Sequence, residues 1–148
     1  MPTLADQLLS ATARPRLVRD CARFLDEEVA RKSGLSGLAI KGAFKTIKAI
    51  KPGFIEGVID ALLDEWVAKL EAHHDRWLAQ GSSPSFAAFA SADASAVAER
   101  LLEVTDARAE RTTHSTALKL YRRLRPNAKG HVVTGVPGLT RVVESYLA

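Results

Sequence analysis

The chain has 148 residues, of which 47% are hydrophobic and 26% are charged. These values are typical of one globular domain, and they exclude both a disordered chain and a fibrous repeat. The formal net charge of +4 permits attraction to nucleic acid or anionic lipid but does not demand it, because acids are interspersed among the basic residues. We therefore expect a single domain over residues 1–148 with one hydrophobic core.

The N-terminal residues predict a cytoplasmic protein, and the cysteine content fits that location without distinguishing it from a secreted protein that lacks disulfides. Residues 1–6 lack the basic leader and apolar run of a signal peptide. No window reaches the about 20 apolar residues that a membrane-spanning helix needs, so we expect no transmembrane segment. The only cysteine, Cys21, excludes a disulfide within the chain. It falls on an apolar helix face, where a thiol is inert.

Apolar residues recur at spacings of three and four, which predicts helices and no sheet. In the first third of the chain we expect helices over Leu4–Ser10, from Pro15 to about Lys32, and over Gly37–Ile50. Ser36 is placed to cap the third helix. Its expected buried line is Ile40, Ala43, Phe44, Ile47 and Ile50. The glycines around its start, and Gly42 within it, are interpreted as allowing two helices to approach closely.

The fourth and longest helix is expected over Phe54–Gln80, where apolar residues repeat on one side. After it we expect a turn capped by Ser83 and a short segment that buries Phe86 and Phe89. A helix over Asp93–Arg111 should follow, and then a helix that is capped by Thr112 or Thr113 and stops at Pro126. The last helix should begin at about Pro137. The fold class is therefore all-α, a single-domain helical bundle of five or six principal helices plus short helical segments.

The charge spacing predicts that the third and fourth helices form an antiparallel hairpin. In such a hairpin three lysines of one helix face three acids of the other, namely Lys48 with Glu56, Lys45 with Asp60 and Lys41 with Asp64. Exposed ion pairs of this kind contribute about 0.2 to 1 kcal/mol each, so they would set register more than stability.

His73 and His74 are the most conspicuous polar residues in the long helix, and Glu71 precedes His74 by three. Di-metal helical bundles use this Glu-x-x-His spacing, but they need a second such motif, which the chain lacks. We expect His74 to be solvated and His73 to pack beside Trp77. The sequence indicates no catalytic residue, no metal site and no cofactor, and small-molecule or metal binding near the two histidines is kept as an alternative.

Two basic surfaces are predicted. Lys41, Lys45, Lys48 and Lys51 lie beside an apolar stripe and would suit an anionic membrane surface, but the acidic partners expected in the hairpin would neutralise them. No acid lies between Glu110 and Glu144 to neutralise a second group. This basic-surface binding site consists of Lys119, Arg122, Arg123, Arg125 and Lys129. No stacking aromatic accompanies it on its polar side.

Three segments carry a family resemblance: Arg31–Gly37, Lys48–Phe54 and Val104–Glu110. They are similar to segments of a family of small all-helical bacterial proteins, common in actinobacteria and related high-GC groups, that is classed as a domain of unknown function. The resemblance extends to Val132-Val133 and Pro137-Gly138-Leu139, and so covers nearly the whole chain. It implies a cytoplasmic bacterial protein of one intact domain, and it implies no activity or ligand.

Taken alone, the sequence favours a noncatalytic interaction or scaffold module with a protein partner. The alternative of another class is electrostatic binding of nucleic acid or anionic membrane through residues 119–129. The pattern contains no catalytic motif, and it gives no indication of the oligomeric state.

Overall fold

The computed structural model describes residues 2–148, which contain seven helices and no strand. The helices are α1 (Leu4–Leu8), α2 (Ala13–Ala30), α3 (Gly34–Lys48), α4 (Phe54–Ala79), α5 (Phe86–Ser91), α6 (Ala94–Arg111) and α7 (Ser115–Glu144). They account for 80% of the chain and form a single compact domain. Five are long and two are short, so the predicted all-α bundle is confirmed.

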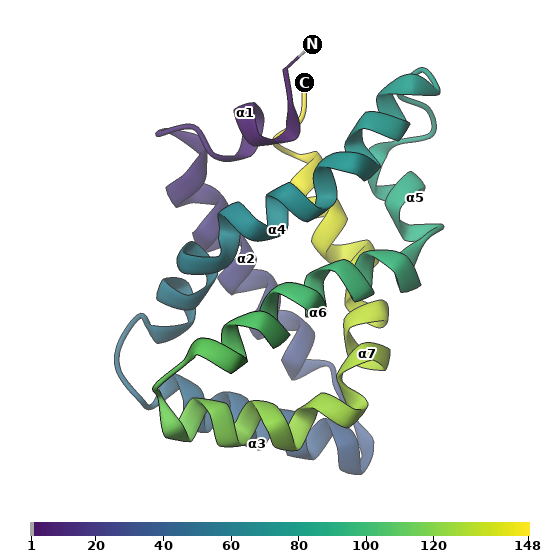
Figure 1. The fold of residues 1–148 in the computed structure, drawn as a ribbon. Coiled ribbons are helices and arrows are strands. Elements are labelled where there is room, and N and C mark those ends of the chain that lie inside the picture. Colours follow the sequence, from purple (N-terminus) through teal and green to yellow (C-terminus); the bar gives the residue numbers. More distant parts are fainter. Residues whose placement is uncertain (1) are drawn as a thin grey trace.

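The hydrophobic core lies between α2, α4, α6 and the second half of α7 (Figure 1). Its fully buried side chains come from all four, for example Leu17, Leu62, Val97 and Val136. The short helices α1 and α5 add Leu4, Leu8 and Phe86 to the core. The segment before α1 and the C-terminal residues lie close together, and the amide of Ala148 donates a hydrogen bond of 2.8 Å to Gln7 Oε1.

The helix α4 has nearly the predicted bounds because its sequence contains both the apolar period and the stop signals. Gly53 precedes it with φ of 76°, a left-handed conformation that glycine adopts without strain. Its predicted apolar line is buried at Ile59, Leu62, Leu70 and Trp77 and half-buried at Ile55 and Trp66. A long periodic segment bounded by glycines is therefore predictable from sequence alone.

The C-terminal third corrects the prediction of two helices. Residues 115–144 form the single helix α7, with Pro126 and Pro137 inside it. Each proline removes one backbone N–H and crowds the carbonyl four residues earlier, which favours a bend rather than a stop. Figure 1 shows the bend, since the first half of α7 runs beside α3 and the second half rises through the core.

The caps of three helices also differ from the prediction. At α5 the Ser85 hydroxyl, not that of Ser83, accepts from the amide of Ala88 at 3.2 Å. At α7 neither threonine caps, because His114 Nδ1 accepts from the amide of Ala117 at 3.3 Å. Ser36 lies inside α3 and contacts His131 Nε2 at 2.6 Å.

The largest difference concerns burial along α3. The helix begins at Gly34 rather than at Gly37, and only Ala43 of the predicted apolar line is buried. The other four residues, Ile40, Phe44, Ile47 and Ile50, are half-buried. The reason is position, because α3 lies at one end of the molecule and packs only along one side, against α2, α7 and the start of α4. Its other side faces solvent.

Candidate functional site

The predicted lysine–carboxylate hairpin is wrong. Asp60 and Asp64 of α4 instead bind Arg14 of α2, whose guanidinium lies 2.8 Å from Asp60 Oδ1 and 3.0 Å from Asp64 Oδ1. This contact holds the pKa of the Asp64 carboxyl below its usual value. Lys48 pairs with Asp26 of α2 at 2.8 Å. Without the hairpin, the other lysines of α3 lose the acidic partners that were expected to neutralise them.

The helix α3 and the first half of α7 lie side by side and form one end of the molecule (Figure 1). Five basic side chains of this end are exposed and form no salt bridge within residues 2–148: Lys45, Lys51, Lys119, Arg122 and Arg123. We call these five residues, together with α3, the turn after it and the first half of α7, the basic end. Its composition unites parts of both basic surfaces predicted from sequence.

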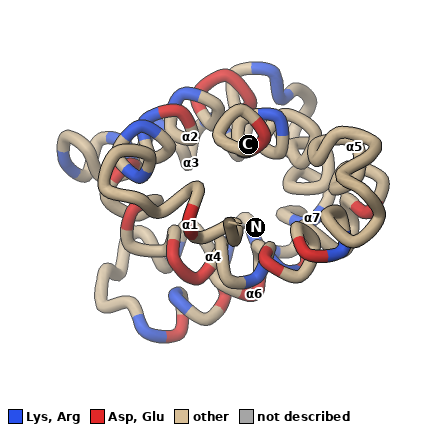
Figure 2. The backbone as a smooth tube through the Cα atoms, turned by 90° about the horizontal axis from the view of Figure 1, so that it is seen from above, with Lys and Arg blue, Asp and Glu red and all other residues tan. Residues whose placement is uncertain are grey.

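No acid lies between Glu28 and Glu56 or between Glu110 and Glu144, so α3 and the first half of α7 carry none. The acids of the protein are concentrated on α2, α4 and α6, as the red positions in Figure 2 show. These two helix segments therefore carry positive charge only, although the net charge of the chain is +4 and other basic residues lie on the remaining helices. Such segregation attracts anions more strongly than the net charge alone implies.

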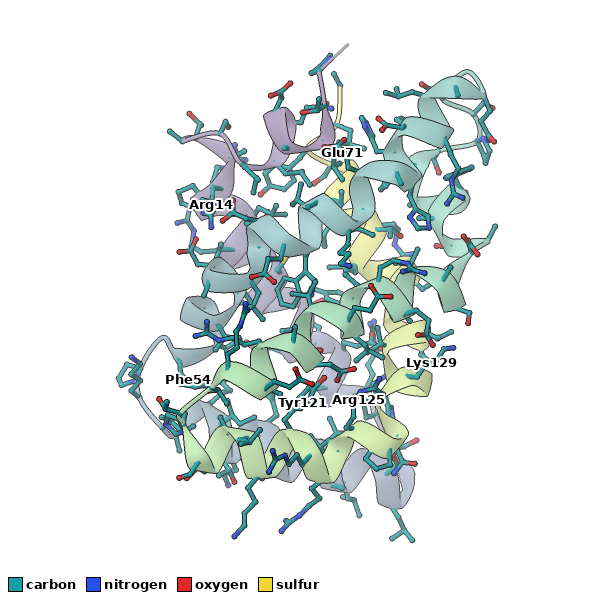
Figure 3. The ribbon with its side chains drawn as sticks, in the orientation of Figure 1. Arg14, Phe54, Glu71, Tyr121, Arg125 and Lys129 are labelled. Carbon is teal, nitrogen blue, oxygen red and sulfur yellow. The ribbon has the colours of Figure 1, made fainter. Side chains whose placement is uncertain are left out.

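Two members of the predicted basic site have a structural role instead. Arg125 donates two hydrogen bonds to Asp106, at 2.8 and 3.0 Å, and Lys129 lies 2.6 Å from Glu99. Tyr121 donates to the same carboxylate, and these side chains lie between α6 and α7 (Figure 3). Burial and Asp106 raise the pKa of Tyr121 to about 12. We call these contacts between α6 and α7 the seam. The seam fixes α7 against α6 and leaves Lys119, Arg122 and Arg123 exposed.

Both histidines of α4 are buried, which corrects the expectation of a solvated His74. His74 is 1% exposed, and its ring lies 5.8 Å from Trp77 and 6.0 Å from Phe86, measured between centroids. His73 is 5% exposed and points elsewhere, with Nε2 3.4 Å from Asp93 Oδ2. That contact is too poorly aligned for a hydrogen bond. Neither ring nitrogen of His73 therefore has a hydrogen-bond partner within residues 2–148.

Glu71, His74 and Asp75 bring one ligand atom each to within 4.8 Å of one another. The carboxylate of Glu71 already accepts hydrogen bonds from the amides of Leu4, at 2.8 Å, and Ala5, at 3.2 Å. It thereby satisfies two free N–H groups at the start of α1 (Figure 3). His74 Nδ1 lies 3.6 Å from the same carboxylate. The cluster thus ties α1 to α4.

Comparison with models of protein families shows which family the chain belongs to. The model of a family of unknown function, DUF6918, matches residues 4–147. The chain belongs to this family. None of the curated proteins and none of the solved structures compared with it gives a match. The family resemblance read from the sequence is confirmed to the extent that a family of unknown function covers nearly the whole chain.

Two other features of this DUF6918 chain are poor candidates for a site. Cys21 is packed against the core, and burial raises the pKa of its thiol to about 12, so the thiolate needed for chemistry is suppressed. A groove between α2 and α7 is lined by charges of both signs, among them Asp20, Glu27, Arg31 and Arg141. None of its side chains is arranged as a nucleophile with a base.

The two exposed leucines are the feature of the DUF6918 chain that sequence reading missed. Leu35 is 88% exposed and Leu38 is 65% exposed, and both precede the lysines of α3. Periodicity assigned no role to either residue, because their exposure depends on how few helices cover this end. The sequence signal for an unusual surface in this segment was the absence of any acid between Glu28 and Glu56.

The buried imidazole of His73 gives a prediction about pH. Burial lowers its pKa, and the positive charge of Arg76 lowers it further, with Arg100 acting the same way and Asp93 opposing both. The unfolded chain therefore takes up a proton near pH 6.5 that the folded chain rejects, so stability falls as the pH drops below that value. Each unit of pKa depression contributes about 1.4 kcal/mol to this loss.

Urea denaturation between pH 7.5 and 5 checks this expectation. His73→Leu should flatten the decline in the free energy of unfolding with falling pH while leaving the carboxylate-driven losses at lower pH in place. An unchanged pH profile in the leucine variant would show that His73 is not the group responsible.

Proposed function

We propose that this protein is a noncatalytic interaction module that binds an anionic partner through the basic end. The observation that carries the proposal is the segregation of charge, since five exposed basic side chains share an end without a single acid on α3 or the first half of α7. Solvated helix faces normally mix both signs, as α2 and α6 do here. An end with one sign is costly in self-repulsion and favours a partner of opposite charge.

The rigidity of the seam between α6 and α7 supports the proposal. Asp106 binds both Tyr121 and Arg125, and these contacts hold the first half of α7 in one orientation. The residues Lys119, Arg122 and Arg123 share that segment, so their charges are presented on a fixed scaffold. A fixed array loses less entropy on binding than side chains on a mobile loop.

The noncatalytic part of the proposal rests on what surrounds the reactive groups. His74 is buried against the rings of Trp77 and Phe86, His73 is buried beside Asp93, and the thiol of Cys21 has a raised pKa. General acid–base catalysis needs a titrating group within hydrogen-bond reach of a bound substrate. The cluster of Glu71, His74 and Asp75 supports the metal-binding alternative, but Glu71 is already engaged by α1. We interpret it as a structural cap.

We also propose that the protein is bacterial and cytoplasmic. The family resemblance in sequence and the single, unreactive cysteine support this assignment. None of the helices in the described part of the chain is both long enough and apolar enough to cross a membrane.

Binding to heparin, a sulfated polyanion, tests the proposed function. The variant Lys119→Gln/Arg122→Gln/Arg123→Gln should bind labelled heparin about a hundredfold more weakly than the wild type at low salt, because each basic residue near an anionic surface contributes about 1 kcal/mol. The triple variant should keep the wild-type unfolding transition, since all three side chains are exposed.

The matched control removes the same charge elsewhere. Arg16, Arg19 and Arg141 are exposed, and they lie on α2 and on the last turn of α7, away from the basic end. Their replacement by glutamine should weaken heparin binding only severalfold, through the change in net charge. If the two triple variants lose equal affinity for heparin, binding depends on net charge alone, which would contradict a localised site.

A further inference from the structure

The exposed side of α3 is unusual for a solvated helix face. At 100° per residue, six exposed uncharged residues share this side: Leu35, Leu38, Ala39, Gly42, Thr46 and Ala49. Lys45 is the only charged residue among them, and Lys41 and Lys48 border them. Solvated faces of globular helices are normally polar or charged. Here a mostly apolar strip lies next to the exposed cations of the basic end.

We propose that the basic end docks on the surface of an anionic phospholipid bilayer, with Leu35 and Leu38 entering the boundary between head groups and acyl chains. This inference rests on the proposed function and names its partner. Apolar side chains beside lysines and arginines are the pattern of helices that lie in the membrane interface. The cations contact the lipid phosphates while the two leucines leave water.

The charge and the side chains of the basic end favour this partner over two others. A second copy of the chain would bring the lysines of two basic ends together, and like charges oppose such an interface. A nucleic acid would gain little from two exposed leucines, and the basic end offers no free aromatic ring for stacking. Tyr121 is held by Asp106 between helices, and the ring of Phe44 is half-buried with Lys48 Nζ 5.4 Å from its centroid.

Charge at the membrane surface also agrees with the proposed location. The cytoplasmic leaflet carries a negative surface potential, and a polybasic surface is attracted to it within about 8 Å at physiological ionic strength. Attachment by electrostatic attraction and two inserted side chains is reversible and salt-sensitive.

Co-sedimentation with vesicles tests the inference. The wild type should partition onto vesicles containing phosphatidylglycerol at least tenfold more than onto vesicles of phosphatidylcholine alone. Leu35→Ser/Leu38→Ser should lower the partition coefficient about tenfold or more. The control Leu35→Met/Leu38→Met keeps the apolar area and should bind like the wild type. All four substitutions are at exposed positions, so the unfolding transition should not move.

The outcomes separate this inference from the proposed function. If the serine variant binds anionic vesicles as well as the wild type, or if neutral vesicles bind equally well, the membrane inference is overturned. Heparin binding without vesicle binding also overturns it and leaves the proposed function standing. If the wild type is a dimer in sedimentation equilibrium and the serine variant is a monomer, the strip binds a second copy of the chain instead. If the wild type binds neither heparin nor anionic vesicles, both proposals are overturned.

Discussion

Phe86→Ala is expected to lower the free energy of unfolding by about 3 to 5 kcal/mol, because it removes a fully buried aromatic ring from a packed site. Phe86 is 1% exposed and contacts Trp77 edge-on, with ring centroids 5.5 Å apart and an interplanar angle of 73°. The His74 ring also contacts the Phe86 ring edge-on. The lost contacts therefore include those of an aromatic cluster that joins α4 to α5.

Urea denaturation followed by circular dichroism measures this loss. The matched control is Phe89→Ala on the same short helix, where the ring is only half-buried and the loss should be clearly smaller. The folded variant should still bind heparin, because α5 lies away from α3 in the bundle (Figure 1). A loss below about 1 kcal/mol for Phe86→Ala would contradict the packing described for this cluster.

Opposite effects on stability are expected from two glycine-to-alanine changes in α3. A Cβ atom on Gly37 would lie 2.8 Å from the carbonyl carbon of Lys32, so the backbone between α2 and α3 would have to shift. We expect Gly37→Ala to cost about 1 to 3 kcal/mol. A Cβ on Gly42 meets nothing within 4 Å. Gly42→Ala should stabilise the protein by about 0.5 to 1 kcal/mol through helix propensity.

Thermal unfolding of the two variants distinguishes their effects by sign. The melting temperature should fall for Gly37→Ala and rise by about 2 to 4 °C for Gly42→Ala. A decrease for Gly42→Ala would mean that this position packs against another helix, as the sequence interpretation of α3 assumed. The open space at Gly42 corrects that interpretation, since this glycine lies on the exposed strip.

The sequence predicts individual helices better than the contacts between them. The bounds of α4 and α6 follow from a regular apolar period and from Gly53 and Thr112 at their borders. The division of α7 was wrong because a proline that usually ends a helix can also bend one when tertiary contacts hold both halves. The burial of Phe86 was predictable, since an aromatic residue at a helix start beside small alanines has no other core to join.

Charge partners were not predictable from spacing on two helices. Helix spacing suggests only the lysines of α3 as partners for Asp60 and Asp64, whereas Arg14 on α2 offers a planar guanidinium that reaches both. A bidentate arginine is the better partner for carboxylates. Likewise, Arg125 was grouped with the free cations because its acid, Asp106, lies on a different helix. Sequence identifies the charges, but only the packing of helices decides which remain free.

The most direct test of the basic end maps its contacts residue by residue. In a titration of the isotope-labelled protein with a short heparin oligosaccharide, backbone amide signals are followed by two-dimensional NMR. We expect shifts concentrated in α3 and in residues 115–125 of α7, with α5 and the groove between α2 and α7 unaffected. Shifts centred on that groove, or spread evenly over the surface, would contradict the basic end as the binding surface.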